Sequence, residues 1–196
     1  MEYLAFFDDI EKIIVEDELL KFLGVNTTGI IDFSYIDTVK SAGHSCAVVA
    51  GAYLIALKGL KALYGEALPQ RGKIKVEIRN AVTQENAGVV GCVLSNITGA
   101  TTDYGFGGIP TGKFGRRELL FYNCDIKEDV RLTDLETNKS VGINYSPQKV
   151  VNPMSILLSA IKPDAKAEDI KSFPVRFQDM VKTVFDNQDR VIEVVQ

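Results

Sequence analysis

The sequence has few of the residues that build metal clusters and disulfide frameworks. Its 196 residues include one histidine, His44, and three widely spaced cysteines, Cys46, Cys92 and Cys124. An odd number of cysteines makes a poor disulfide framework, so we expect reduced thiols and a cytoplasmic protein. No C-x-x-C pair occurs, which excludes the usual zinc finger. A hydrolase triad would have to use His44, and no G-x-S-x-G elbow is present.

Strongly basic stretches and long apolar runs are also missing. The formal net charge is −4, and no cluster of lysine and arginine dominates, so we expect no nucleic-acid partner. The most apolar run, residues 46–57, is too short to cross a bilayer, and Lys58 follows it at once. The N-terminus has no basic region followed by an apolar run, so we expect no signal peptide and no membrane association.

The length and composition of the sequence suit one domain of ordinary size, because 46% of the residues are hydrophobic and 24% are charged. Helical spacing of apolar residues predicts helices, and alternation or short apolar runs predict strands. The helices are expected over 2–23, 45–64 and 153–161, with another opened by Pro174, and residues 30–42 are irregular or a short helix. The strands are expected over 73–79, 88–97, 117–123, 130–135 and 140–145, the last two as a hairpin, with 190–196 a final strand or tail.

This order of elements predicts an α+β fold. We expect N-terminal helices packed on a mainly antiparallel sheet, which together form a core domain over residues 1–150. Residues 151–196 are expected to form a C-terminal helical extension that packs on the core or on a partner subunit.

The segment Gly43-His44-Ser45-Cys46 is the first candidate for chemistry, because it precedes the buried helix expected over 45–64. Unpaired N–H groups and the positive end of the helix dipole stabilise a thiolate at a helix N-terminus. A thiolate and an imidazole two residues apart can both reach one ion such as zinc. The alternative is that His44 only caps the helix and Cys46 is a small buried residue.

Two further residues are candidate ligands. Cys92 lies in the apolar segment 88–97 and precedes the polar turn 98–103, where Asp103 stands. Cys92 is either a third ligand or an ordinary core residue, and Asp103 is a ligand, a general base or a turn residue. A thiol-redox pair of Cys46 and Cys92 is also open, and it requires Cα atoms within about 7 Å of each other.

The third candidate is the glycine-rich segment 105–115. Residues 107–113 match G-x-x-x-x-G-K, but Phe114 follows where a P-loop has a hydroxyl for magnesium, and no helix is expected to follow. We therefore expect either a flap over a pocket or a solvated loop. If it is a flap, Lys113, Arg116 and Arg117 could neutralise an anionic ligand or cofactor.

At His44 the sequence resembles the E-subunit family of formylmethanofuran dehydrogenase. The family signature H-G-H-x-C-P, followed by a glycine-bearing helix, is similar to residues 42–46 with Gly51 behind them. The family's D-A-I-Q-x-x-T-G-C-T stretch is similar to residues 92–101, in which Thr98, Gly99 and Thr101 match. The resemblance extends over residues 35–145.

Some positions depart from the family pattern. The family's first histidine is Ala42 here, its proline is Ala47, and its second cysteine is Ala100. His44 and Cys46 carry over directly. Cys92 stands where the family has aspartate, and a thiolate there could replace a lost ligand.

The resemblance implies an α+β core that forms an intertwined homodimer. Together with the His44 and Cys46 pattern, it leads us to expect a metal-binding protein that serves small-molecule chemistry or cofactor handling. Zinc is the first expectation for the metal, and iron, including haem iron, is the alternative. A non-catalytic sensor or partner-binding component of a redox enzyme system is the competing hypothesis.

Overall fold

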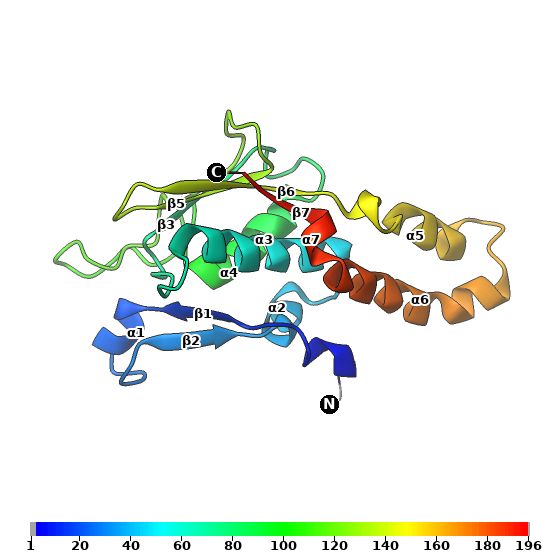
Figure 1. The fold of residues 1–196 in the computed structure, drawn as a ribbon, viewed down its shortest axis with the longest axis horizontal. Coiled ribbons are helices and arrows are strands. Elements are labelled where there is room, and N and C mark those ends of the chain that lie inside the picture. The colour runs from blue at the N-terminus through cyan, green and yellow to red at the C-terminus, as the bar shows by residue number, and fades with distance from the viewer. Residues whose placement is uncertain (1–2, 196) are drawn as a thin grey trace.

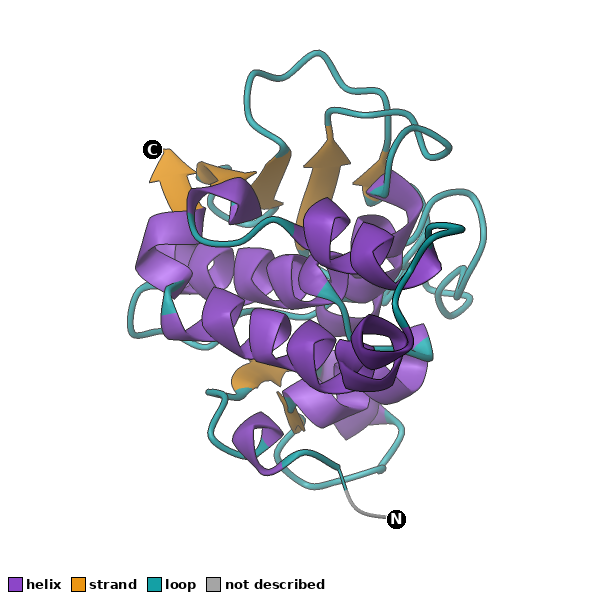
Figure 2. Ribbon diagram, turned by 90° about the vertical axis from the view of Figure 1, so that its right-hand side faces the viewer, coloured by secondary structure: helices purple, strands orange, loops and turns teal. Residues whose placement is uncertain are grey.

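A computed structural model describes residues 3–195 of the chain. It has three layers: a five-stranded sheet, a layer of long helices, and a two-stranded sheet on the opposite side of those helices (Figure 1; Figure 2). The elements in chain order are η1 (Ala5–Phe7), β1 (Ile13–Glu16), α1 (Glu18–Phe22), β2 (Ile30–Phe33), α2 (Tyr35–Ala42), α3 (Ala47–Tyr64), β3 (Ile74–Ile78), α4 (Ala87–Thr98), β4 (Leu120–Phe121), β5 (Val130–Asp134), β6 (Ser140–Tyr145), η2 (Pro147–Lys149), α5 (Pro153–Ile161), α6 (Ala167–Asp186), α7 (Gln188–Val191) and β7 (Ile192–Val195).

The five-stranded sheet has the strand order β4-β3-β5-β6-β7. Neighbours from β3 through β7 pair antiparallel, and only β4 runs parallel to β3. In β3, Ile74, Val76 and Ile78 are buried while the two residues between them are more exposed, as the alternating sequence predicts. The α+β class, the mainly antiparallel sheet and the 130–145 hairpin are thus confirmed.

Helix α3 forms the centre of the core, as predicted for residues 45–64. It packs on α4 and α6 and against the sheet at β5, β6 and β7. Gly59 lets the sheet approach closely, because a Cβ there would meet the side chains of Leu132 and Ile143. By length and composition alone, this helix of 18 residues could cross a membrane. However, 72% of it is buried inside the structure. That burial accounts for the apolar sequence.

The predicted helix over residues 2–23 is wrong. Ile13 and Val15 are buried and Ile14 between them is exposed, so the side chains alternate as in a strand. β1 pairs antiparallel with β2, and β-branched residues at 13–15 fit this pleated surface better than a helix. Only α1 is α-helical in this region, and the carboxylate of Asp17 caps it by accepting from the Leu19 amide.

The predicted strand over residues 88–97 is also wrong, because these residues belong to α4. A short apolar run does not separate a buried strand from a buried helix by periodicity. The buried residues Ala87, Leu94 and Ile97 recur at helical spacing, and Gly99 ends the helix in the left-handed conformation. Residues 117–123 contribute only the two-residue strand β4.

The C-terminal segment contains the predicted helices and a strand. Asn152 caps α5 by accepting from the Ser155 amide at 3.0 Å, as its sequence predicts. Pro174 does not open a helix, because α6 begins at Ala167 and includes it. Helices α5 and α6 form a hairpin that projects from the core (Figure 1). After α7 the chain returns to the five-stranded sheet, where β7 pairs with β6. Of the two alternatives for residues 190–196, the structure therefore has the strand.

Candidate functional site around Cys46

The segment 43–46 is a tight connection between α2 and α3. Gly43 ends α2 with φ 77° and ψ 0°, a left-handed conformation that glycine adopts without strain. Cys46 is the N-cap residue of α3, and its side chain does not cap the first amides of that helix. His44 and Ser45 therefore stand between the end of α2 and the start of α3, whose first amides follow Cys46.

His44 is exposed, and one ring nitrogen is already engaged. Its Nδ1 lies 3.0 Å from the carbonyl oxygen of Ala42. A carbonyl oxygen only accepts hydrogen bonds, so Nδ1 carries the proton and donates. In the neutral imidazole, Nε2 then keeps its lone pair. Metal-binding histidines are commonly held by such a bond from the second ring nitrogen.

Ser45 connects this segment to α2 and α6. Its hydroxyl lies 2.9 Å from the Tyr35 hydroxyl, and its carbonyl oxygen accepts from Gln178 Nε2 at 3.1 Å. Because that carbonyl can only accept, the Gln178 amide must turn its nitrogen toward it. The other amide atom, Oε1, is buried and has no hydrogen-bond partner among residues 3–195. An acceptor without a partner thus lies beside Ser45.

Two tyrosines flank the Cys46 thiol. Burial raises the pKa of Tyr35, and although the bond with Ser45 lowers it, the nearby Cys46 raises it further. Burial likewise raises the pKa of Tyr145, and the nearby Cys46 and Tyr35 raise it further. Both hydroxyls therefore stay protonated at neutral pH.

Tyr145 lies across the first turns of α3. Its hydroxyl donates to the carbonyl oxygen of Ala47 at 2.6 Å. The ring fits there because residue 51 is glycine, and an added Cβ would collide with the ring atoms. This contact is the structural reason for Gly51 in an otherwise apolar helix.

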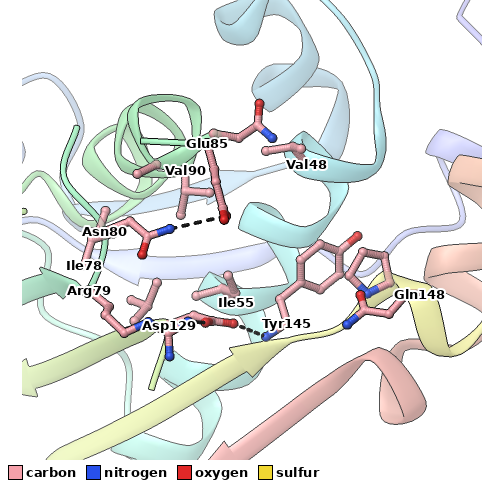
Figure 3. A pocket seen from close by; sticks show the side chains of 14 residues that line it. Val48, Ile55, Ile78, Arg79, Asn80, Glu85, Val90, Asp129, Tyr145 and Gln148 are labelled. Carbon is pink, nitrogen blue, oxygen red and sulfur yellow. Dashed lines mark hydrogen bonds and ion pairs between the residues drawn. The ribbon is translucent and has the colours of Figure 1, made fainter. Parts of the chain in front are cut away.

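A cavity of about 350 Å³ lies next to Tyr145 (Figure 3). It is enclosed by α3, the start of α4 and the ends of β3, β5 and β6. Asp129 accepts from the Tyr145 amide at 2.9 Å and pairs with Arg79 at 2.5 Å. Asn80 donates to Glu85 at 3.3 Å across the cavity mouth. A cavity of this size with a few fixed polar groups suits a small molecule.

The other two predicted ligands lie elsewhere. Cys92 is exposed on α4 and influences Tyr122, whose pKa is raised to about 12 by burial and then by Cys92. Asp103 is exposed and accepts from the Thr102 hydroxyl at 3.0 Å. Over residues 3–195, no three His, Cys, Asp or Glu side chains are grouped to hold a metal ion. The structure thus does not assemble the predicted four-residue ligand set.

Two of the three predicted cationic residues, Lys113 and Arg116, line one cavity, and Arg117 is not in its lining. Arg116 is buried and pairs with Asp17 at 2.6 Å. Arg117 is exposed and donates from Nε to the carbonyl oxygen of Gly105 at 2.8 Å, which holds the glycine-rich loop.

The sequence did not indicate Tyr35, Tyr145, Gln178 or the ion partners Asp17 and Arg71. A signal for Tyr145 existed, since a glycine inside a buried helix indicates close approach of another group. No local pattern announces Gln178, because it reaches Ser45 across 133 residues.

No protein-family model matches this chain, and no curated protein matches it significantly. The resemblance to the E-subunit family of formylmethanofuran dehydrogenase therefore remains a prediction from His44, Cys46 and Gly51.

Proposed function

We propose that the chain is a metal-binding protein similar to the formylmethanofuran dehydrogenase E-subunit family, with His44 Nε2 and Cys46 Sγ as its protein ligands. Zinc is the proposed ion, because an imidazole and a thiolate are its common ligands, and iron or haem iron is the alternative. The ion would serve small-molecule chemistry or cofactor handling.

The observation that carries this proposal is the bond between His44 Nδ1 and the Ala42 carbonyl. It fixes the tautomer that a metal ligand needs and orients the ring without involving Nε2. Cys46 does not cap the first amides of α3, so the positive end of the helix dipole faces the proposed sulfur ligand. The orphan Gln178 Oε1 supplies an acceptor for a water or substrate hydrogen at this place.

Two protein ligands leave coordination positions for water or substrate, which distinguishes the site from a closed structural zinc site. The cavity beside Tyr145 is the proposed location of the small molecule. Tyr145 would position it through its ring, because Tyr145 lines this cavity while its hydroxyl is held by the Ala47 carbonyl.

We also propose that the protein is an intertwined homodimer through the α5–α6 arm, residues 153–178. Helix α5 has no charged residue and no buried residue. Its Met154, Leu158 and Ile161 are exposed, as are Ile170 and Val175 on α6. Exposed apolar residues gathered in this way mark an interface. A second copy would cover them and bring further groups toward the α3 N-terminus.

The competing function is a non-catalytic sensor or partner-binding component. The same arm favours it, because the exposed apolar residues would then dock on a different protein. Sedimentation analysis of the pure chain separates the two: a homodimer supports self-association, whereas a monomer at micromolar concentration supports a foreign partner.

Elemental analysis of the full chain, purified without added metal and after incubation with zinc, tests the metal proposal. We expect bound zinc to be lost in His44→Ala. Because the His44 side chain is exposed and only bonds its own loop, this variant should keep the stability of the parent. Cys124→Ser is the control, since Cys124 follows β4 and its amide bonds to Ile78. Stoichiometric zinc in His44→Ala would refute the proposed ligand.

A further inference from the structure

A second cavity, of about 590 Å³, lies away from Cys46 between α1, residues 71–73 and the end of the glycine-rich loop. Phe22 and Phe114 line it together, with ring centroids 5.3 Å apart. The cavity therefore has an apolar wall. It joins segments that are nearly a hundred residues apart in sequence, and an ion cluster holds these segments together.

The cluster has more positive than negative charge. Asp17 pairs with Arg71 at 2.7 Å through one carboxylate oxygen and with Arg116 at 2.6 Å through the other. Two guanidinium groups thus share one carboxylate. Burial lowers the pKa of Arg116, and Arg71 lowers it further against the opposing effect of Asp17. A ligand with negative charge would complete this arrangement.

Arg71 still has a free donor. Its Nη1 bonds Asp17 and its Nη2 donates to the carbonyl oxygen of Asn96 at 3.0 Å. Its Nε is buried and has no acceptor among residues 3–195. A buried N–H without a partner is costly, so the present arrangement leaves Arg71 with an unmet hydrogen-bond donor.

Two lysines in the rest of the lining are not neutralised by an ion pair. Lys73 is neutralised by Glu18 at 3.1 Å and Glu136 at 2.7 Å, while Lys21 and Lys113 have no ion pair within 4.0 Å in the described part of the chain. With Asp17 and Glu136 included, five cationic groups face four acidic ones. The cations are Lys21, Arg71, Lys73, Lys113 and Arg116, and the acids are Glu16, Asp17, Glu18 and Glu136.

We propose that this cavity binds a phosphate monoester with an aromatic or apolar body, the phosphate near Arg71, Lys21 and Lys113 and the body on Phe22 and Phe114. The two lysines without an ion pair, Lys21 and Lys113, match a phosphate, which carries close to two negative charges at neutral pH. Arginine presents donors in a geometry that suits phosphate oxygens. This ligand site is independent of the metal proposed at Cys46.

Calorimetric titration of the full chain with phenyl phosphate, inorganic phosphate and benzoate tests the proposal. We expect phenyl phosphate to bind most tightly, because inorganic phosphate lacks the ring and benzoate carries one charge. In Phe22→Ala, the affinity for phenyl phosphate should fall to that for inorganic phosphate. Binding should persist in His44→Ala, which separates this site from the metal site.

The charge requirement is tested by two matched double variants. Lys21→Gln with Lys113→Gln should weaken phenyl phosphate binding about tenfold. Lys139→Gln with Lys149→Gln removes the same charge outside the cavity and should leave the affinity unchanged. Equal weakening by both pairs means diffuse attraction and overturns the proposal. Benzoate binding as tightly as phenyl phosphate, or no binding of phenyl phosphate at millimolar concentration, overturns it as well.

Discussion

Replacing Asp17 by asparagine should strongly destabilise the fold. The Asp17 side chain is 3% exposed and accepts from Arg71 and Arg116, whose side chains are 23% and 8% exposed. Asparagine keeps the size of the side chain and can still cap α1, so the substitution isolates the charge. It leaves the buried guanidinium group of Arg116 and the half-buried one of Arg71 without a carboxylate between them.

The expected cost is about 3–5 kcal/mol, because removing one partner of a buried ion pair leaves an uncompensated charge. With a urea m-value of about 2–3 kcal/mol per molar, the unfolding midpoint should fall by about 1–2.5 M. The matched control is Asp32→Asn, which breaks the Lys12 pair at 2.6 Å between side chains that are each 57% exposed. Exposed pairs contribute little, so the control should unfold almost as the parent does.

The pH dependence of the same measurement gives a second check. Burial by itself raises the pKa of Asp17, but the hydrogen bond from Arg71 and the charges of Arg116 and Arg71 outweigh it and lower the pKa below 3.8. A lowered folded-state pKa stabilises the fold above the unfolded pKa, and this stabilisation is lost as the pH falls through the folded value. The difference in unfolding midpoint between the parent and Asp17→Asn should therefore be constant near neutral pH and shrink below about pH 4. Equal midpoints of the two proteins at pH 7 would refute the reasoning.

Three further outcomes are expected. Gly51→Ala should destabilise the chain by about 1–3 kcal/mol in urea unfolding, because its Cβ meets the Tyr145 ring. In a variant that already carries Tyr145→Ala, the same substitution should destabilise less, and equal destabilisation in both backgrounds would contradict the contact. Tyr145→Phe should cost about 1 kcal/mol by removing the bond to the Ala47 carbonyl, and an unchanged midpoint would show that the bond does not form in solution. If the proposed homodimer forms through the arm, Ile161→Asp should convert it to a monomer in sedimentation analysis, and a stable dimer would place the interface elsewhere.

The sequence predicted the elements whose periodicity is long or strictly alternating. Helix α3, strand β3 and the β5–β6 hairpin fall where expected, because their patterns fit only one kind of structure. The α4 helix was missed because a run of valine, leucine and isoleucine fits a buried strand equally well. Its identity is decided by tertiary contacts with α3 and by Gly91, which lets Tyr122 approach.

The candidate site was predictable only in its local part. His44 and Cys46 are neighbours on the chain, so their proximity follows from the sequence. Tyr145 bonds to Ala47, 98 residues away in the sequence, and Gln178 bonds to Ser45, 133 residues away. No spacing rule connects such distant positions. Arg116 was expected to face a ligand, and its pairing with Asp17 depends on a fold that brings residues 99 positions apart together.

The central proposal is that the His44 imidazole and the Cys46 sulfur bind one metal ion. The most direct test is the absorption spectrum of the full chain titrated with Co²⁺, because a cobalt–thiolate bond gives an intense near-ultraviolet charge-transfer band. The account predicts this band in the parent and in Cys124→Ser, and its loss in Cys46→Ser and His44→Ala. A band that survives in Cys46→Ser, or a parent protein without the band, would contradict it.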